Sequence, residues 1–177
     1  MDNTEYVILV DEQDRETGIM EKQQAHVEGK LHRAISVFIF NTKGELLLQQ
    51  RAAGKYHSAN LWTNTCCSHP RPGEQVQAAA VRRLMEEMGM VCDLEEIFSF
   101  IYKAELGTLT EYELDHVFTG TTDVVPVPDA GEVANWKYVD AQELDDMMHD
   151  HPEEYTEWFK ICFRDWRNEL MGKKIRG

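Results

Sequence analysis

Residues 63–70, TNTCCSHP, set the thiol of Cys67 two positions before the imidazole of His69. A thiol beside a cation or metal ion becomes a thiolate more readily, and a thiolate is suited to removing a proton from carbon. Because Pro70 and Pro72 bound the segment, we expect a loop to present both side chains. Alternatively, Cys67 is a small buried apolar residue and His69 a surface residue, since free cysteines are commonly inert.

Four other side chains are of types that bind divalent metal ions. His26 and His32 flank a short spacer, and histidine is the commonest metal ligand. Glu111 and Glu113 stand two apart in TEYELDHVF. With His69 they make a nitrogen and oxygen ligand set suited to zinc, manganese or another divalent ion. Seven histidines in 177 residues also make chance proximity common, so the histidine pair alone decides nothing.

The strand that carries these glutamates has two chemically different faces. Alternation puts Glu111, Glu113 and Asp115 on one face. The other face carries Tyr112, Leu114, His116 and Phe118. We expect the apolar set to mark the core side. The acidic row would then face solvent, unless that face of the sheet lines a pocket.

Residues 74–88 predict a helix with one buried stripe and two charged pairs. Arg82 with Glu86, and Arg83 with Glu87, stand four apart, which places each pair on a shared helical face. Alone, such pairs are ordinary exposed salt bridges, each stabilising by a few tenths of a kcal/mol.

The whole segment from Ser68 to Met90 resembles the Nudix pattern G-x5-E-x7-R-E-U-x-E-E-x-G-U, in which U is a bulky apolar residue. The matching positions are Ser68, Glu74, Arg82, Glu86, Glu87, Gly89 and Met90. In Nudix proteins this loop and helix hold divalent metal against a diphosphate. Ser68 replaces the opening glycine, and Arg83 stands where Nudix hydrolases have a metal-binding glutamate. A cation cannot ligate a cation, so the resemblance implies a diphosphate grip without hydrolysis.

Over roughly residues 4 to 170 the chain resembles the type I isopentenyl-diphosphate delta-isomerases. The resemblance implies that Cys67 and Glu113 are catalytic, assisted by Tyr102. It implies that one Mn2+, Zn2+ or Mg2+ is held by His26, His32, His69, Glu111 and Glu113. It implies that Glu87 binds a Mg2+ carried by the substrate. It implies substrate contacts by Lys22, Arg51, Lys55, Arg83 and Trp158. The ordinary alternative for Trp158 is packing in the core, in a stripe with Phe159 and Cys162.

The elements that must position these side chains can also be predicted. Residues 34–40 and 45–50 are strand-like around the turn NTKG, and 97–105 and 110–120 flank LGTL as a second hairpin. Residues 136–140 predict another strand. Asp140 is suited to cap a helix through about Met148, and Pro152 to begin a final helix ending near Met171. Residues 124–132 predict an irregular connection. The order implies an α/β (α+β) fold with a mixed sheet between helices, and the resemblance implies that residues 1–177 form one Nudix-like domain.

Composition limits the partners and the compartment. The formal net charge of -14 argues against a nucleic-acid partner. Residues 1–90 hold 10 basic and 12 acidic side chains and residues 91–177 hold 8 and 20, so basic contacts to an anion should come from the first half. With neither a long apolar run nor a secretory signal, we expect a cytoplasmic protein without a membrane partner, monomeric or weakly dimeric. Four cysteines predict free thiols.

The resemblance implies an isomerase that interconverts isopentenyl and dimethylallyl diphosphate by a metal-assisted proton shift in isoprenoid biosynthesis. The main alternative is a Nudix hydrolase of a nucleoside or prenyl diphosphate, with incidental histidines. Another is a non-catalytic binding module stabilised by metal. A reaction in D2O distinguishes the first two, since an isomerase puts deuterium into the prenyl chain and a hydrolase releases phosphate.

Overall fold

The structure is a computed structural model that describes residues 4–172. The expected domain of residues 1–177 therefore includes two short ends, 1–3 and 173–177, that lie outside the described residues. The strands are β1 (Tyr6–Val10), β2 (Glu16–Glu21), β3 (His32–Phe40), β4 (Leu46–Arg51), β5 (Trp62–Thr63), β6 (Cys66–Ser68), β7 (Glu95–Leu106), β8 (Leu109–Thr121) and β9 (Val133–Val139). The α-helices are α1 (Lys22–Glu28), α2 (Val76–Met88), α3 (Ala141–Asp150) and α4 (Glu157–Met171).

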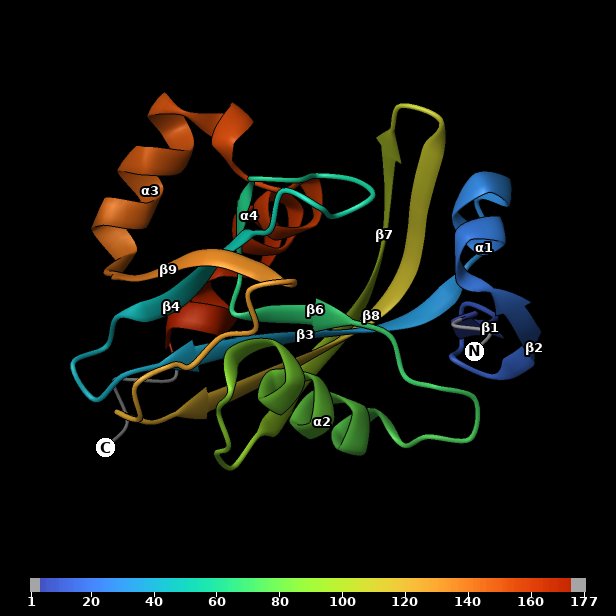
Figure 1. The fold of residues 1–177 in the computed structure, drawn as a ribbon, viewed down its shortest axis with the longest axis horizontal. Helices are drawn as coiled ribbons and strands as arrows, with labels where there is room; N and C mark the ends of the chain where they lie inside the picture. Colours follow the sequence, from blue (N-terminus) through green and yellow to red (C-terminus); the bar gives the residue numbers. More distant parts are fainter. Residues whose placement is uncertain (1–3, 173–177) are drawn as a thin grey trace.

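A mixed sheet forms the centre of the molecule, and helices cover both of its faces (Figure 1). β3 runs parallel to β8 from His32 opposite Glu113 to Phe40 opposite Thr121. β6 pairs antiparallel with β3 on its other side, and β4 pairs with β9. The predicted mixed sheet between helices is confirmed.

Alternating side chains of β3 divide the core into two layers. Ile35, Val37 and Ile39 pack toward α2 with Leu84. Phe38 packs in the opposite layer, which includes residues of α3 and α4. Each buried side chain of this size contributes roughly 1.5 to 3 kcal/mol by leaving water. β3 is therefore fixed from both sides, as a strand that positions a site must be.

Most of the predicted elements are present. Asp140 caps α3 by accepting a hydrogen bond from the backbone N–H of Glu143 over 2.8 Å. Gly89 ends α2 with a φ of 62°, and a Cβ there would lie 2.3 Å from the backbone oxygen of Val127. Only glycine fits this position, because its φ is left-handed and the backbone approach is close. β7 and β8 form the second hairpin, and residues 124–132 connect β8 to β9 without a strand or helix.

Three local predictions are wrong or incomplete. Pro152 begins a 3-10 turn, Pro152–Glu154, whereas α4 starts at Glu157. Cys67 lies in the short strand β6, since pairing with β3 satisfies its backbone, so the loop begins only at His69. β3 and β4 pair at a single position beside their turn, Phe40 with Leu46, because β4 turns away to pair with β9.

Within residues 4–172 no helix has the length and apolar character needed to span a membrane. All four cysteines are free thiols, as predicted.

Candidate active site

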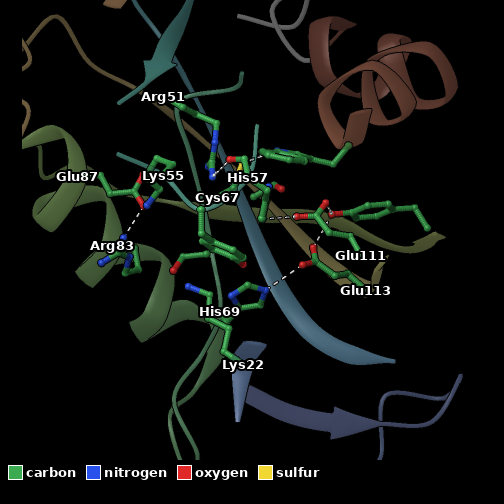
Figure 2. Close-up of a pocket in the computed structure, with 15 residues that line it drawn as sticks. Lys22, Arg51, Lys55, His57, Cys67, His69, Arg83, Glu87, Glu111 and Glu113 are labelled. Carbon is green, nitrogen blue, oxygen red and sulfur yellow. Dashed lines mark hydrogen bonds and ion pairs between the residues drawn. The ribbon is translucent and has the colours of Figure 1, made fainter. Parts of the chain in front are cut away.

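One cavity collects nearly every side chain that the sequence singled out (Figure 2). Its empty space is about 500 Å³, part of which is open to solvent. The predicted residues that line it are Lys22, Arg51, Lys55, Cys67, His69, Arg83, Glu87, Tyr102, Glu111, Glu113 and Trp158. His26 and His32 are fully buried beside it. Segments far apart in the chain therefore build a single site.

The acidic row of β8 is buried, and its Glu111 and Glu113 line this cavity. Glu111, Glu113 and Asp115 are 4%, 6% and 1% exposed, so of the two alternatives for this face a solvated row is wrong and a pocket lining holds for the two glutamates. The physical reason is that α1 and the β4–β5 connection cover this face, with His26 and His57 against the glutamates.

Four of the five predicted metal ligands meet around Glu113. Its Oε1 lies 2.9 Å from His69 Nε2, 3.3 Å from His32 Nε2 and 3.9 Å from His26 Nε2. The register explains part of this grouping, since His32 pairs directly with Glu113 across β3 and β8. The ligand atoms of the group all lie within 4.8 Å of one another.

The chemistry of His26 fits a cation at this position. Its Nδ1 lies 2.7 Å from the backbone oxygen of Lys22, which can only accept, so Nδ1 carries the proton. Burial lowers the pKa of His26, so the ring is neutral and Nε2 presents a lone pair. That atom is buried without a hydrogen-bond partner and faces the Glu113 carboxylate. A divalent cation between two such acceptors would satisfy both.

Glu111 stands apart from this group. Its Oε1 lies 3.4 Å from Nε2 of His57, and His26, His57 and Glu111 form a second potential ligand group. Tyr102 joins the two glutamates, donating to Glu113 Oε2 over 2.6 Å and contacting Glu111 Oε2 at 3.1 Å. Burial, followed by the charge of Glu113, raises the pKa of Glu111 well above its usual range.

Cys67 lies on the same cavity wall, between two polar contacts. The indole Nε1 of Trp158 donates to its sulfur over 3.0 Å, and the sulfur donates to Asn64 Oδ1 over 2.8 Å. Burial raises the pKa of the Cys67 thiol, with Asp115 adding to the effect, so the metal-free protein holds a thiol. The neighbouring Cys66 points the opposite way, into the layer under α2, and is fully buried there.

The opposite end of the cavity is basic (Figure 2). Arg83 Nη2 contacts Glu87 Oε1 at 2.5 Å, and Lys55 Nζ contacts Glu132 Oε2 at 2.5 Å. Lys22 pairs with Glu5 at 2.6 Å.

The two arginines of α2 have different roles. Arg82 binds both oxygens of Glu74 at 2.7 and 2.8 Å and so fixes the loop before the helix. Arg83 is the one of the pair that faces the cavity.

Trp158 combines the two roles considered for it. It is 4% exposed and packs in the layer with Phe159 and Cys162, as a core residue would. It also lines the cavity, and the Arg51 guanidinium lies 5.2 Å from its ring centre.

Sequence reasoning missed several residues at the site. Tyr56, His57 and Ser36 line the cavity, and Asn64 supports Cys67. Tyr56 and His57 lie in the β4–β5 connection, whose sequence AAGKYHSAN carries neither periodicity nor ligand spacing. The one signal in the sequence was that His57 stands two residues after Lys55, which was itself a predicted substrate contact.

Comparisons with known proteins agree with this geometry. The fold, together with the loop and helix that carry Glu74, Arg82 and Glu87, defines a Nudix domain, and the NUDIX domain family model matches residues 30–159. A protein of Deinococcus radiodurans superposes with a TM-score of 0.75 at 17% identity, covering 90% of this chain and 98% of its own. At that identity the likeness establishes the fold alone.

Relatives by sequence are more specific. The isopentenyl-diphosphate Delta-isomerase of Pectobacterium atrosepticum is 53% identical over 158 residues, covering 89% of this chain and 88% of its own length. That of Photobacterium profundum is 47% identical over 176 residues, covering 96% and 98%. The chain belongs to the isopentenyl-diphosphate Delta-isomerase family.

Proposed function

We propose that this protein interconverts isopentenyl diphosphate and dimethylallyl diphosphate. The observation that carries the proposal is the division of one cavity into a basic end and a proton-transfer end, with Arg83 at the position of a hydrolase glutamate. Family membership supports the same reaction. A hydrolase is not favoured, because Arg83 stands where Nudix hydrolases have a glutamate that binds their metal ions.

The basic end would hold the diphosphate. Arg83 and Lys55 lie at this end, Lys22 and Arg51 line the same cavity, and Glu87 would bind a Mg2+ carried by the substrate. In the present structure Arg83 and Lys55 contact Glu87 and Glu132, so the diphosphate would exchange with these carboxylates. Binding energy at this end would position the carbon atoms of the substrate's prenyl chain, which make no polar contacts of their own.

The other end would carry the proton shift. In the forward direction Glu113, assisted by Tyr102, would give a proton to the terminal methylene carbon, and Cys67 would take one from the carbon next to the oxygen-bearing carbon. The double bond moves by one carbon, one proton is gained and one is lost. Trp158 would stabilise the intermediate tertiary cation by about 2 kcal/mol in this desolvated site.

The surroundings of Cys67 and Glu113 indicate which of the two holds the proton before the reaction begins. Burial raises the pKa of Cys67. Burial also opposes the charge on Glu113, but His32 and His69 beside it hold its pKa well below the usual range. A thiol with a carboxylate is the starting state for the reverse direction, from dimethylallyl to isopentenyl diphosphate. The forward direction needs the proton on the Glu113 side, where Tyr102 already donates a hydrogen bond.

The histidines and glutamates would hold one divalent ion, Mn2+, Zn2+ or Mg2+. Such an ion would neutralise the buried carboxylates and fix their orientation. His26 and His32 supply the supporting contacts expected of ligands, since each directs Nδ1 at a backbone oxygen, 2.7 and 2.8 Å away.

The test is formation of dimethylallyl diphosphate from isopentenyl diphosphate with Mg2+ present. Cys67→Ala should abolish it, and Cys92→Ala, a half-buried thiol outside the cavity, should not. Full turnover by Cys67→Ala would refute the assigned role of the thiol.

A further inference from the structure

His57 faces the metal-binding end of the cavity from the connection between β4 and β5. Its side chain is 9% exposed, and its Nε2 lies 3.4 Å from Glu111 Oε1. That separation is longer than the 2.7 to 3.2 Å of an ordinary N–H···O hydrogen bond. The ring also packs edge-on against Trp158, 5.9 Å between centres. His57 therefore approaches Glu111 closely without forming a standard hydrogen bond to it.

The connection holds this ring in a defined position. Arg51 Nη2 donates to the backbone oxygen of His57 over 3.2 Å, and the backbone N–H of Arg51 donates to the backbone oxygen of Leu61. Ser58 and Asn60 have left-handed backbone angles, with φ of 50° and 64°. In this turn the His57 side chain is almost buried, whereas Tyr56 is 47% exposed.

The contacts of His57 resemble those of His26 and His32, with a serine hydroxyl in place of the backbone oxygen. In both of those histidines Nδ1 is held by a backbone oxygen and Nε2 points at the glutamates. In His57, Nδ1 lies 3.2 Å from Ser58 Oγ and Nε2 points at Glu111. A histidine that ligates metal typically has its other ring nitrogen fixed in this way.

The two potential ligand groups share one atom. His26 belongs to both, and since its Nδ1 is taken by Lys22, only Nε2 is free to bind metal. One lone pair serves one ion, so an ion bound to His26 Nε2 would lie beside both groups. Glu113 provides the carboxylate of one part and Glu111 that of the other.

We propose that His57 is a fourth histidine of this metal centre, binding through Nε2 on the Glu111 side the same ion that His26 holds. The inference rests on the proposed function, which requires that centre. A fourth imidazole would favour ions that accept nitrogen ligands, such as Zn2+, over Mg2+, which prefers oxygen. His57 would thus help to select the ion.

The test measures Zn2+ binding by the metal-free protein in competition with a chromogenic chelator, without substrate. His57→Ala and His57→Gln should each bind Zn2+ at least about tenfold more weakly than the parent, since even supporting residues of metal sites cost that much. His149→Ala, an exposed histidine outside the cavity, is the matched control and should bind as the parent does. Circular dichroism of the metal-free proteins checks that the variants fold.

A second readout reports ligation directly. In the Co2+-loaded protein, each ligand histidine with a protonated Nδ1 gives a hyperfine-shifted, exchangeable proton resonance. His57→Gln should lose one such resonance and keep the others.

The outcomes separate the inference from the proposed function. A parent protein that binds Zn2+, with His57 variants that match it in affinity and in Co2+ spectrum, would overturn the role of His57 alone. A parent that binds neither ion would overturn the metal centre, and the inference with it.

Discussion

The indole N–H of Trp158 points at the sulfur of Cys67 over 3.0 Å, joining the last helix of the chain to the strand that presents the thiol. A hydrogen bond to a charged group contributes about 1.5 to 3 kcal/mol, so this contact favours the thiolate against burial. The metal-free protein holds a thiol nevertheless, because burial raises the pKa of Cys67.

Trp158→Phe keeps an aromatic ring and removes the N–H. We expect the Cys67 thiolate to become rarer, so that alkylation of Cys67 by iodoacetamide slows about tenfold or more at pH 8. The measurement uses a Cys92→Ala background, since Cys92 is partly exposed. Trp166→Phe, whose ring stacks on Phe98 away from the thiol, is the control. Equal rates of Cys67 alkylation in Trp158→Phe and Trp166→Phe would contradict the role of the Trp158 indole.

Tyr102→Phe removes the hydroxyl that donates to Glu113 over 2.6 Å. Since a positioned acid or base contributes about 100-fold or more, we expect kcat to fall by roughly that factor with little change in KM. Tyr112→Phe is the matched control, because Tyr112 lies on the other face of the same strand. Equal kcat values for the two variants would remove Tyr102 from the proton transfer.

Arg83→Met tests the basic end of the cavity. Loss of one charge-assisted contact to a diphosphate should raise KM about tenfold or more, with a smaller change in kcat. Arg164→Met, at an exposed arginine of α4, should leave KM unchanged. Thermal unfolding must be recorded as well, because Glu87 loses its partner. An unchanged KM for a folded Arg83→Met protein would show that the diphosphate binds elsewhere.

The stability of the metal-free protein should depend on His69. Burial lowers its pKa from 6.5 to about 4 in the folded state. Between these values the unfolded chain binds a proton that the folded protein excludes, so stability falls as pH drops from about 6.5 and levels off below about 4. The shift corresponds to about 3 kcal/mol as an order of magnitude.

His69→Gln has no such group and should lose less stability over this range, which denaturant unfolding at pH 7, 5.5 and 4.5 will measure. Parallel pH dependences for parent and variant would show that His69 is not excluded from protonation.

Elements with a regular pattern could be predicted from the sequence. The buried stripe and charged pairs of residues 74–88 marked α2, and Asp140 marked the start of α3. β2 and α1 could not be predicted, because TGIMEKQQAHVEG has no strong periodicity and α1 is only seven residues long, whereas β1, the short apolar run YVILV, was overlooked. Their stability depends on tertiary contacts, such as those of α1 with β8, that no local pattern encodes.

The site was predictable where a motif covers it. Arg83 and Glu87 follow from the helix pattern, and Cys67 from its segment. His57 could not be found, since its position depends on left-handed turns at Ser58 and Asn60 that bring a connecting segment over β8. The alternation along the strand also did not by itself predict that Glu111 and Glu113 are buried, because a face that lines a site departs from the usual rule that charged residues face water.

The most direct test of the proposed reaction is incubation of the protein with isopentenyl diphosphate and Mg2+ in D2O, followed by NMR of the products and assay of free phosphate. We predict that deuterium enters the prenyl chain and that dimethylallyl diphosphate forms, and that both require Cys67. We also predict that no phosphate is released. Phosphate release with an undeuterated chain would instead establish a hydrolase and contradict the isomerase.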